Sequence, residues 1–453
     1  MTILIKNGTI ITAKKSFKAD ILVADGKISR IGQLQNDIVK ADKQIDAAGL
    51  YVFPGGIDPH VHMHLPSPAG FSSDDFYTGS KAALYGGTTT IIDFVTPQKG
   101  QSLPDALAER KKEAQNSLID YSFHVSPIEW HNRTEKEIKE IKNEGITSFK
   151  TYMAYKNSIG LDDDDLFKIM KAVAKTGGLL TVHAELGDDI EELRTNYAKA
   201  NKLSPKYHPL SRPDEMEAEA VKKAIELAKK ANCSLYIVHV SAKESLVHIR
   251  KAQKAGQKVY AESCPHYLLL DDSRYDGTFE QTAPFVLSPP LRKKEDQEAL
   301  WEAIADNIIQ TIGTDHCPFT IKQKQKGQND FRKIPNGAGG VEHRLTLLYT
   351  YGVLQNKFSI NNFVDIISTQ AAKIFGLYPR KGEIAVGSDA DLIIWNPDKK
   401  KIISSKNHKQ HCDIDIFEGF ETYGFAEYVI VNGQIAIKDG KLIKETSGRF
   451  LKR

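Results

Sequence analysis

A prediction of the fold begins with the stretch Val52-Phe53-Pro54-Gly55-Gly56-Ile57-Asp58-Pro59-His60-Val61-His62, which ends in two histidines one residue apart. Alternate side chains of a β-strand point to the same face, so His60 and His62 can bind one cation. This spacing favours a metal site at the end of a strand. The pair alone is weak evidence, because two nearby histidines also occur by chance on polar loops.

Other potential metal ligands also follow short apolar or β-branched segments. His183 follows residues 179–182, His239 follows residues 235–238, and Asp315 follows residues 310–314. Any single histidine could instead be a hydrogen-bonded polar residue under a loop. That alternative is disfavoured here, because all of these residues come at the C-terminal ends of candidate strands.

Short segments rich in Val, Ile, Thr or aromatic residues predict eight strands, at 56–60, 89–94, 120–125, 147–151, 179–183, 235–239, 258–262 and 310–314. Polar stretches of helical period lie between them, for example at 134–143, 215–231 and 293–305. Such alternation indicates a parallel sheet, and eight strands can close into a (β/α)₈ barrel. The C-terminal strand ends of a barrel meet at one mouth. We therefore expect the potential ligands to be neighbours in space.

Both ends of the chain have β character. Residues 1–53 contain the turn signals Asn7-Gly8 and Asp25-Gly26, and the apolar runs 390–395 and 428–431 lie near the C-terminus. We expect one β-sandwich domain built from residues 1–53 and 382–453, with the barrel inserted as residues 54–381. Two unrelated β extensions are the alternative. The lysine-rich segments 14–18 and 396–409 predict only solvated surface.

Bulk properties exclude several classes of protein. The chain has 453 residues and a net charge of +3, with both signs mixed, so nothing in its composition favours nucleic acid or an anionic membrane as a partner. No apolar segment approaches the roughly 18 residues that span a bilayer, and the first residues lack a signal-peptide pattern. The default expectation is a cytoplasmic protein. Cys233, Cys264, Cys317 and Cys412 are scattered and are predicted to be free thiols.

A set of motifs spread in order over nearly the whole chain resembles the dihydropyrimidinase and D-hydantoinase family of cyclic amidohydrolases. These motifs are Pro54-Gly55-Gly56-Ile57-Asp58-Pro59-His60-Val61-His62, Gly86-Gly87-Thr88-Thr89-Thr90-Ile91-Ile92-Asp93-Phe94, Ser148-Phe149-Lys150-Thr151-Tyr152-Met153-Ala154-Tyr155-Lys156, His183-Ala184-Glu185, Ile334-Pro335-Asn336-Gly337 and Gly387-Ser388-Asp389-Ala390-Asp391-Leu392. The last motif alone marks only the wider superfamily.

The resemblance implies two divalent metal ions per subunit, with zinc as the expected metal. Its implied ligands are His60, His62 and Asp315 for one ion, His183 and His239 for the other, and Lys150 for both. Lys150 would bridge the ions as a carbamate formed with CO₂, that is, as N6-carboxylysine. A lysine in an apolar strand is otherwise interpreted as a cation that reaches the surface. Burial and nearby metal charge favour the neutral amine, which is the form that captures CO₂.

The implied reaction is the hydrolytic ring opening of cyclic ureides, either 5,6-dihydropyrimidines or 5-substituted hydantoins, to N-carbamoyl amino acids by a metal-bridging hydroxide. Asp315 would move the proton during catalysis, and Tyr155 would donate a hydrogen bond to the developing oxyanion. Ser288 and Asn336 match positions that hold the edge of the substrate ring. The resemblance also implies a homotetramer.

The expected substrates are uncharged rings. A dihydroorotase-like enzyme carries an arginine after the His-x-His pair to neutralise a substrate carboxylate, whereas this chain has Met63-His64-Leu65-Pro66. His64 departs from the family pattern; we expect it to line the substituent pocket or lie at the surface rather than bind metal. The loop 63–76, with Phe71, is predicted to shape that pocket. Two alternatives stay open: another cyclic amidohydrolase such as an allantoinase, and a non-catalytic assembly protein of the same family, although such relatives lack the metal ligands.

Overall fold

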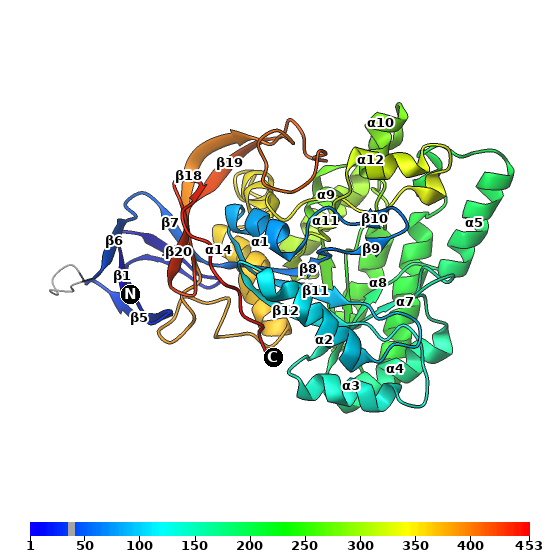
Figure 1. Cartoon of the computed structure of the whole chain (residues 1–453), viewed down its shortest axis with the longest axis horizontal. Coiled ribbons are helices and arrows are strands. Elements are labelled where there is room, and N and C mark those ends of the chain that lie inside the picture. The colour runs from blue at the N-terminus through cyan, green and yellow to red at the C-terminus, as the bar shows by residue number, and fades with distance from the viewer. Residues whose placement is uncertain (35–40) are drawn as a thin grey trace.

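Parallel strands form the central barrel of the computed structural model, which describes residues 1–34 and 41–453 (Figure 1). In chain order they are β8 (Gly56–Val61), β11 (Thr88–Val95), β12 (Asp120–Val125), β13 (Ser148–Tyr152), β14 (Leu179–His183), β15 (Ser234–Ile237), β16 (Val259–Ser263) and β17 (Thr311–Ile312). Each strand pairs with the next along the chain. All eight predicted strands are confirmed, and nearly all of their residues are buried.

Polar contacts join the first and last strands of the barrel. Val61 forms a parallel bridge with His316, and the hydroxyl of Thr314 donates to Asp58 Oδ2 at 2.6 Å. The fully buried Arg344 donates through Nη1 to the carbonyl oxygens of residues 57 and 312, at 2.7 and 2.9 Å. One guanidinium therefore ties β8 to β17, where the sheet must close on itself.

Amphipathic helices cover the barrel, and the predicted helices at 134–143, 215–231 and 293–305 are confirmed as α3, α7 and α11. The longer helices between barrel strands are α1 (Phe76–Tyr85), α2 (Leu103–Glu113), α3 (Thr134–Asn143), α4 (Asp163–Lys175), α5 (Gly187–Lys199), α7 (Asp214–Ala231), α8 (Lys243–Lys254) and α11 (Lys294–Ala305). In α3, Ile138 and Ile141 lie three positions apart and are both buried, as expected for a helix that covers a sheet. The short helices are α6 (Tyr207–Leu210), α9 (Pro265–Leu269), α10 (Phe279–Thr282), α12 (Ile321–Lys324), α13 (Arg344–Leu348), α14 (Ile360–Val364) and α15 (Gln370–Ile374).

The two ends of the chain form a β-sandwich beside the barrel (Figure 1). One sheet contains β5 (Lys27–Gly32), β4 (Asp20–Ala24), β1 (Ile3–Lys6) and β6 (Lys43–Asp46); the other contains β21 (Lys441–Leu442), β20 (Gln434–Lys438), β19 (Glu421–Val431), β18 (Leu392–Ile402), β7 (Tyr51–Pro54), β2 (Thr9–Ile11) and β3 (Ser16–Lys18). Their shared core includes Ile3, Ile21, Val52 and Leu392. The predicted sandwich from both termini is confirmed, whereas its exact boundaries at 53/54 and 381/382 stay predictions.

Of the two predicted hairpin turns, one forms a hairpin and the other does not. Asp25-Gly26 joins β4 to β5 as an antiparallel hairpin, with φ values of 50° and 75° that suit Asp and Gly. Asn7-Gly8, by contrast, does not form a hairpin: β1 and β2 belong to different sheets. Asn7 has a φ of 62°, and its N–H donates to Asp20 at 2.9 Å. A side chain at Gly8 would meet Val52 at 2.7 Å. The chain therefore uses this turn to cross from one sheet to the other.

The prediction that residues 396–409 are only solvated surface is wrong. Strand β18 continues to Ile402, and Ile403 and His408 are buried. The lysines of this segment are mostly exposed, and the two buried residues lie among them. Residues 14–18 do lie mostly at the surface and include the edge strand β3.

The remaining general predictions can be compared directly with the structure. All four cysteines are free, and Cys412 alone among them is partly exposed. Among the described residues, none of the helices is long and apolar enough to cross a membrane. A short two-stranded ribbon, β9 (Pro66–Ser67) and β10 (Gly70–Phe71), forms the tip of the loop after β8.

Replacing Arg344 by methionine tests the closure of the barrel. Arg344→Met should lower the free energy of unfolding by about 3 kcal/mol or more, because buried carbonyl groups lose their donor and Asp58 loses a nearby positive charge. Arg250→Met is the matched control: Arg250 is partly exposed, pairs with Asp306 at 3.0 Å, and should contribute less than about 1 kcal/mol. Urea denaturation of both variants measures the difference. Equal losses would remove Arg344 from this role.

Candidate active site

One group of potential ligands lies where β8 and β17 end. The Oδ1 atom of Asp315 lies 3.1 Å from Nε2 of His60 and 3.0 Å from Nε2 of His62. These three side chains come close enough to one another to hold a metal ion. They lie on or just after the first and last barrel strands, which the contacts of Thr314 and Arg344 join.

The other predicted ligands lie next to this group. The ring of His239 is 5.4 Å from that of His60 and 4.6 Å from that of His183. Lys150 is fully buried, with Nζ 4.9 Å from the ring centre of Phe94, and its charge lowers the pKa of both His183 and His239 after the larger effect of burial. The structure thus gathers all six predicted ligands at the C-terminal ends of the strands.

Two carboxylates orient the imidazoles, and the prediction from sequence missed both of these contacts. Glu262 lies 2.6 Å from Nδ1 of His60 and accepts the N–H of His239 at 3.2 Å. Glu185 lies 2.6 Å from Nε2 of His183. A carboxylate behind a histidine fixes which ring nitrogen carries the proton and leaves the other free for a metal. Glu262 ends its strand as the predicted ligands do, and this position was the available signal.

The chemistry of the cluster fits divalent cations. Nε2 of His60 and Nδ1 of both His62 and His239 are buried and have no hydrogen-bond partner among the described residues. Burial opposes charge on His60, but Glu262 and Asp315 outweigh burial and raise its pKa to about 9. The pocket therefore favours positive charge, which a metal ion can supply while the imidazoles act as neutral ligands.

Lys150 differs from an ordinary surface lysine. Burial lowers the pKa of its amine to about 8, although Asp315 and Glu262 act in the opposite direction. The side chain is 1% exposed, so the amine cannot reach solvent as a surface lysine would. This lowered pKa leaves part of the amine neutral near neutral pH, and the neutral amine is the form that reacts with CO₂.

The three predicted substrate-binding residues also come together. The side-chain amide of Asn336 donates to the hydroxyl of Ser288 at 2.8 Å, and Ser288 interacts with the hydroxyl of Tyr155. The Tyr155 ring lies 5.1 Å from that of His183. Burial raises the pKa of Tyr155, so its hydroxyl keeps its proton and can donate it in a hydrogen bond.

A buried lysine holds the two loops that carry Ser288 and Asn336. The ammonium of Lys324 donates to the carbonyl oxygens of Val286, Pro335 and Gly337, at 2.9, 2.9 and 2.8 Å. Lys324 is 1% exposed and lies at the end of α12. Its three donors therefore set the distance between one loop and the other.

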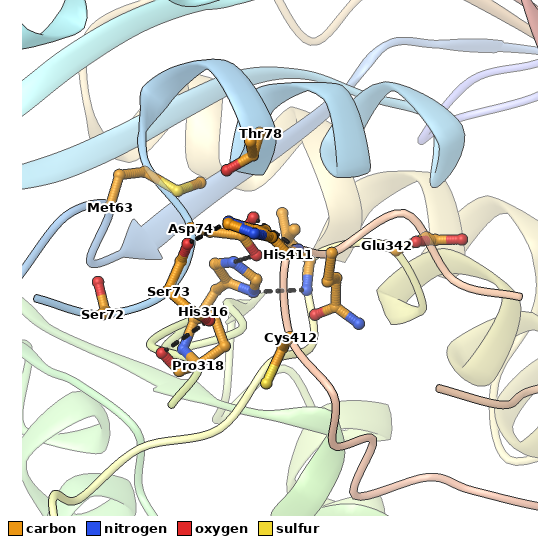
Figure 2. A network of polar contacts seen from close by, with 12 residues as sticks. Met63, Ser72, Ser73, Asp74, Thr78, His316, Pro318, Glu342, His411 and Cys412 are labelled. Atoms are coloured by element: carbon orange, nitrogen blue, oxygen red, sulfur yellow. Dashed lines mark hydrogen bonds and ion pairs between the residues drawn. The ribbon is translucent and has the colours of Figure 1, made fainter. Parts of the chain in front are cut away.

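A polar network fixes the residue after Asp315 (Figure 2). Nδ1 of His316 accepts the N–H of Gly340 at 3.2 Å, so Nε2 carries the proton and donates to Asp74 Oδ2 at 3.1 Å. Asp74 also accepts the N–H of His411 at 2.9 Å through Oδ1. The network joins three segments: the loop before α1, which carries Asp74, the loop that carries Asp315, and the C-terminal segment that carries His411. It holds the backbone that carries Asp315.

Several residues of the site have left-handed backbone conformations. The φ values are 60° for Tyr155, 40° for His239 and 49° for Asp315. Such values are unfavourable for residues other than glycine and persist where surrounding contacts enforce them. In each case the chain turns sharply past a strand end and directs the side chain into the barrel mouth.

His64 lies outside the group of His60, His62 and Asp315. Its ring stacks on Phe71, with 3.9 Å between ring centres and 10° between planes. Phe71 is 50% exposed and pairs with Pro66 at the end of the β9–β10 ribbon away from its turn. This position agrees with the expectation of a loop or pocket residue and supplies no argument for a ligand role.

Comparison with known proteins identifies the class. The model of the amidohydrolase family matches residues 51–436. The D-hydantoinase of Geobacillus stearothermophilus is 43% identical over 457 residues, covering 100% of this chain and 97% of that protein. The dihydropyrimidinase of Rattus norvegicus is 39% identical over 459 residues, covering 100% and 88%. The chain therefore belongs to the amidohydrolase family.

The comparison of structures gives the narrower relationship. The crystal structure of dihydropyrimidinase from Brevibacillus agri NCHU1002 superimposes with a TM-score of 0.98 and 41% identity, covering 100% of this chain and 99% of that one. The resemblance to hydantoinases and dihydropyrimidinases that the motifs predicted is confirmed over the full chain.

Removing the negative charge behind His60 should weaken metal binding. We expect Glu262→Gln to lower metal affinity about 10- to 100-fold, because the amide holds the imidazole less firmly and makes it a poorer ligand. Glu302→Gln, an identical change at an exposed position of α11, should have no effect. Competition with a chelator at fixed metal concentration gives both affinities. Unchanged affinity in Glu262→Gln would refute the role of this carboxylate.

Proposed function

We propose that this protein opens cyclic ureides by hydrolysis, converting 5,6-dihydropyrimidines or 5-substituted hydantoins to N-carbamoyl amino acids. The observation that carries the proposal is the set of buried, unpartnered imidazole nitrogens beside Asp315 and Tyr155 at the mouth of the barrel. Relatives that match the full chain bear the names D-hydantoinase and dihydropyrimidinase. Family, fold and candidate site thus support one class of reaction.

Two divalent metal ions, with zinc as the expected identity, are part of the proposal. The proposed ligands are His60, His62 and Asp315 for the first ion, His183 and His239 for the second, and Lys150, as N6-carboxylysine, for both. Bound ions would supply Lewis-acid activation of water and of the substrate carbonyl. Reaction of the neutral Lys150 amine with CO₂ forms an N–C bond and releases a proton, which turns a buried base into an anionic oxygen ligand.

Asp315 is the proposed proton carrier. Burial tends to raise the pKa of its carboxyl, but the charges of His60 and His62 outweigh burial and hold the pKa well below its usual value. The group is therefore an anion that can accept the proton of the attacking water. Donating this proton to the departing ring nitrogen then restores the carboxylate.

Tyr155, Ser288 and Asn336 are the proposed substrate-binding residues. The protonated hydroxyl of Tyr155 can donate to the oxygen on which negative charge develops, a contact that is worth roughly 3 kcal/mol in comparable sites. Ser288 and Asn336 offer adjacent donors and acceptors that suit the planar N–H and C=O edge of a ureide.

Charge at the site favours neutral rings. The guanidinium of Arg212 lies 5.6 Å from the Tyr155 ring centre, but Glu185 accepts hydrogen bonds from both Nε and Nη2. Arg110, which donates to the carbonyl of Met63, is paired with Asp93 at 2.6 Å. Neither cation is left to neutralise a substrate carboxylate, whose burial without a partner costs several kcal/mol.

The alternatives have less support. The relatives that match the full chain do not favour an allantoinase, and a non-catalytic assembly role would not require the filled set of ligand positions. A homotetramer, which rests on family resemblance, and a cytoplasmic location remain parts of the proposal.

Substrate competition tests the proposed function. Dihydrouracil or hydantoin should exceed dihydroorotate in kcat/KM by at least about a hundredfold, equivalent to ~2.7 kcal/mol of differential transition-state binding. Allantoin, assayed in parallel, represents the alternative activity. Asp315→Asn should lose turnover by orders of magnitude with every substrate, which excludes a contaminating enzyme. A preference for dihydroorotate or allantoin would overturn the assignment.

Loss of the bridging lysine tests the proposed carbamate. Lys150→Ala should lose both metal and activity, and short-chain carboxylates should restore part of each by supplying the missing anionic oxygens. The control Lys139→Ala changes an exposed lysine of α3 and should behave like the wild type. Metal analysis and turnover are measured on the same samples. A Lys150→Ala protein with full metal content and turnover would rule out the bridge.

A further inference from the structure

A second cluster of potential ligands lies where the C-terminal loop, residues 403–420, packs against the start of α13. It consists of His343, His408, Gln410 and Asp415, and shares no residue with the candidate active site. All four residues are at least nine-tenths buried, with exposed fractions of 1%, 9%, 6% and 8%. Three of them come from the segment that the lysine pattern had predicted to be surface or from its immediate continuation.

The polar atoms of this cluster converge on one point. Oδ2 of Asp415 lies 2.7 Å from Nε2 of His343 and 2.9 Å from Nδ1 of His408. The Gln410 amide, through Nε2, lies 3.3 and 3.2 Å from the same two ring nitrogens. In a tetrahedral zinc site with bonds near 2.0–2.2 Å, ligand atoms are about 3.3 Å apart. The two Gln410 distances already match, and the two Asp415 contacts need to lengthen by about 0.4–0.6 Å.

The position of the proton on His408 is the first evidence that a further proton or a cation lies between these atoms. Nε2 of His408 lies 2.8 Å from the carbonyl oxygen of Cys412, which can only accept, so Nε2 carries the proton. Nδ1 of the neutral ring then presents a lone pair to Asp415 Oδ2, which presents another. Two facing lone pairs at 2.9 Å require either a second proton on His408 or a cation.

Gln410 supplies an independent sign. Its Oε1 is buried and has no hydrogen-bond partner in the part of the chain that the structure describes, while its Nε2 faces the two imidazoles. A half-turn of the amide exchanges the two atoms and directs Oε1 to the imidazoles. Two nitrogens and two oxygens then surround one position, and Nε2 of His343 has a free lone pair when the proton of that ring is on Nδ1.

We propose that His343, His408, Gln410 and Asp415 bind a divalent first-row metal ion. Two imidazoles, one carboxylate and one amide oxygen form a mixed nitrogen and oxygen set that suits zinc. All four positions are filled by protein atoms, as in structural rather than catalytic sites. The ion is therefore additional to those of the barrel mouth.

The proposed role of this ion is to join the C-terminal loop to the start of α13. His343 precedes α13, which carries Arg344, whereas the other three ligands lie on the C-terminal loop. His411 of that loop donates its N–H to Asp74 in the network behind Asp315 (Figure 2). The ion clamps the loop to the barrel and so supports this network without touching the substrate.

Metal content measures the proposed site directly. After saturation with Zn²⁺ and dialysis, the full-length Asp415→Asn protein should hold one equivalent less per chain than the wild type. Asp413→Asn makes the same change two residues earlier at an exposed position and should hold as much as the wild type. Chelator treatment should lower the Tm of Asp413→Asn by more than that of Asp415→Asn, since only the former has the ion to lose. Equal metal content in the two variants would overturn the proposal and assign the position to a proton on His408.

Metal content in the Lys150→Ala variant distinguishes an ion at this site from ions at the candidate active site. In Lys150→Ala, which should lack the barrel metals, one equivalent of Zn²⁺ should remain, and adding Asp415→Asn should remove it. If Lys150→Ala instead keeps the wild-type content, the proposed Lys150 bridge fails, while the difference between Asp413→Asn and Asp415→Asn still decides the loop site. A Lys150→Ala protein without any Zn²⁺ would contradict the loop site, whether or not Asp415→Asn folds.

Discussion

The buried carboxylate of Glu262 is the interaction on which the arrangement of the site depends. It contacts Nδ1 of His60 at 2.6 Å, the N–H of His239 at 3.2 Å and the hydroxyl of Tyr236 at 2.8 Å. These groups come from different parts of the barrel. A Cβ atom at Gly313 would lie 2.7 Å from the same carboxylate. The chain just after the last strand can therefore pack against Glu262 only with glycine at this position. One anion thus sets both the orientation of the ligands and the spacing of the strands that deliver them.

Sequence reasoning predicted the barrel because each strand carries its own local signal. The eight short apolar segments, and the rule that parallel strands end at one mouth, were enough to bring together His60, His183 and Asp315. Lys150 was predicted only from the resemblance to the family. Contacts between distant residues left no comparable signal. Nothing in the sequence links Arg344 to the carbonyls of residues 57 and 312, or Asp74 to His316. Composition also misled at residues 396–409, because the lysine content of this segment does not reveal that Ile403 and His408 are buried.

Strain and support occur together at the mouth. Tyr155, His239 and Asp315 each have a positive φ, which a loop adopts only when its neighbours compensate. The network around Asp74 and His316 gives that compensation beside Asp315, and Glu262 gives it beside His239. The candidate site residues are therefore held in place by side chains that lie behind them. Packing and the placement of protons on these supporting side chains, rather than the reaction, decide which residue types occupy their positions.

The three carbonyl contacts of Lys324 have a consequence for how this protein can diverge. The loops that present Ser288 and Asn336 share one buried ammonium, so an insertion or deletion in either loop would pull a carbonyl away from it and leave charge unsatisfied. The two loops must therefore change together or keep their lengths. Variation is easier in the β9–β10 ribbon, where Phe71 is half exposed. Evolution of substrate range in this lineage should proceed through the ribbon, while the two loops that carry Ser288 and Asn336 keep their lengths.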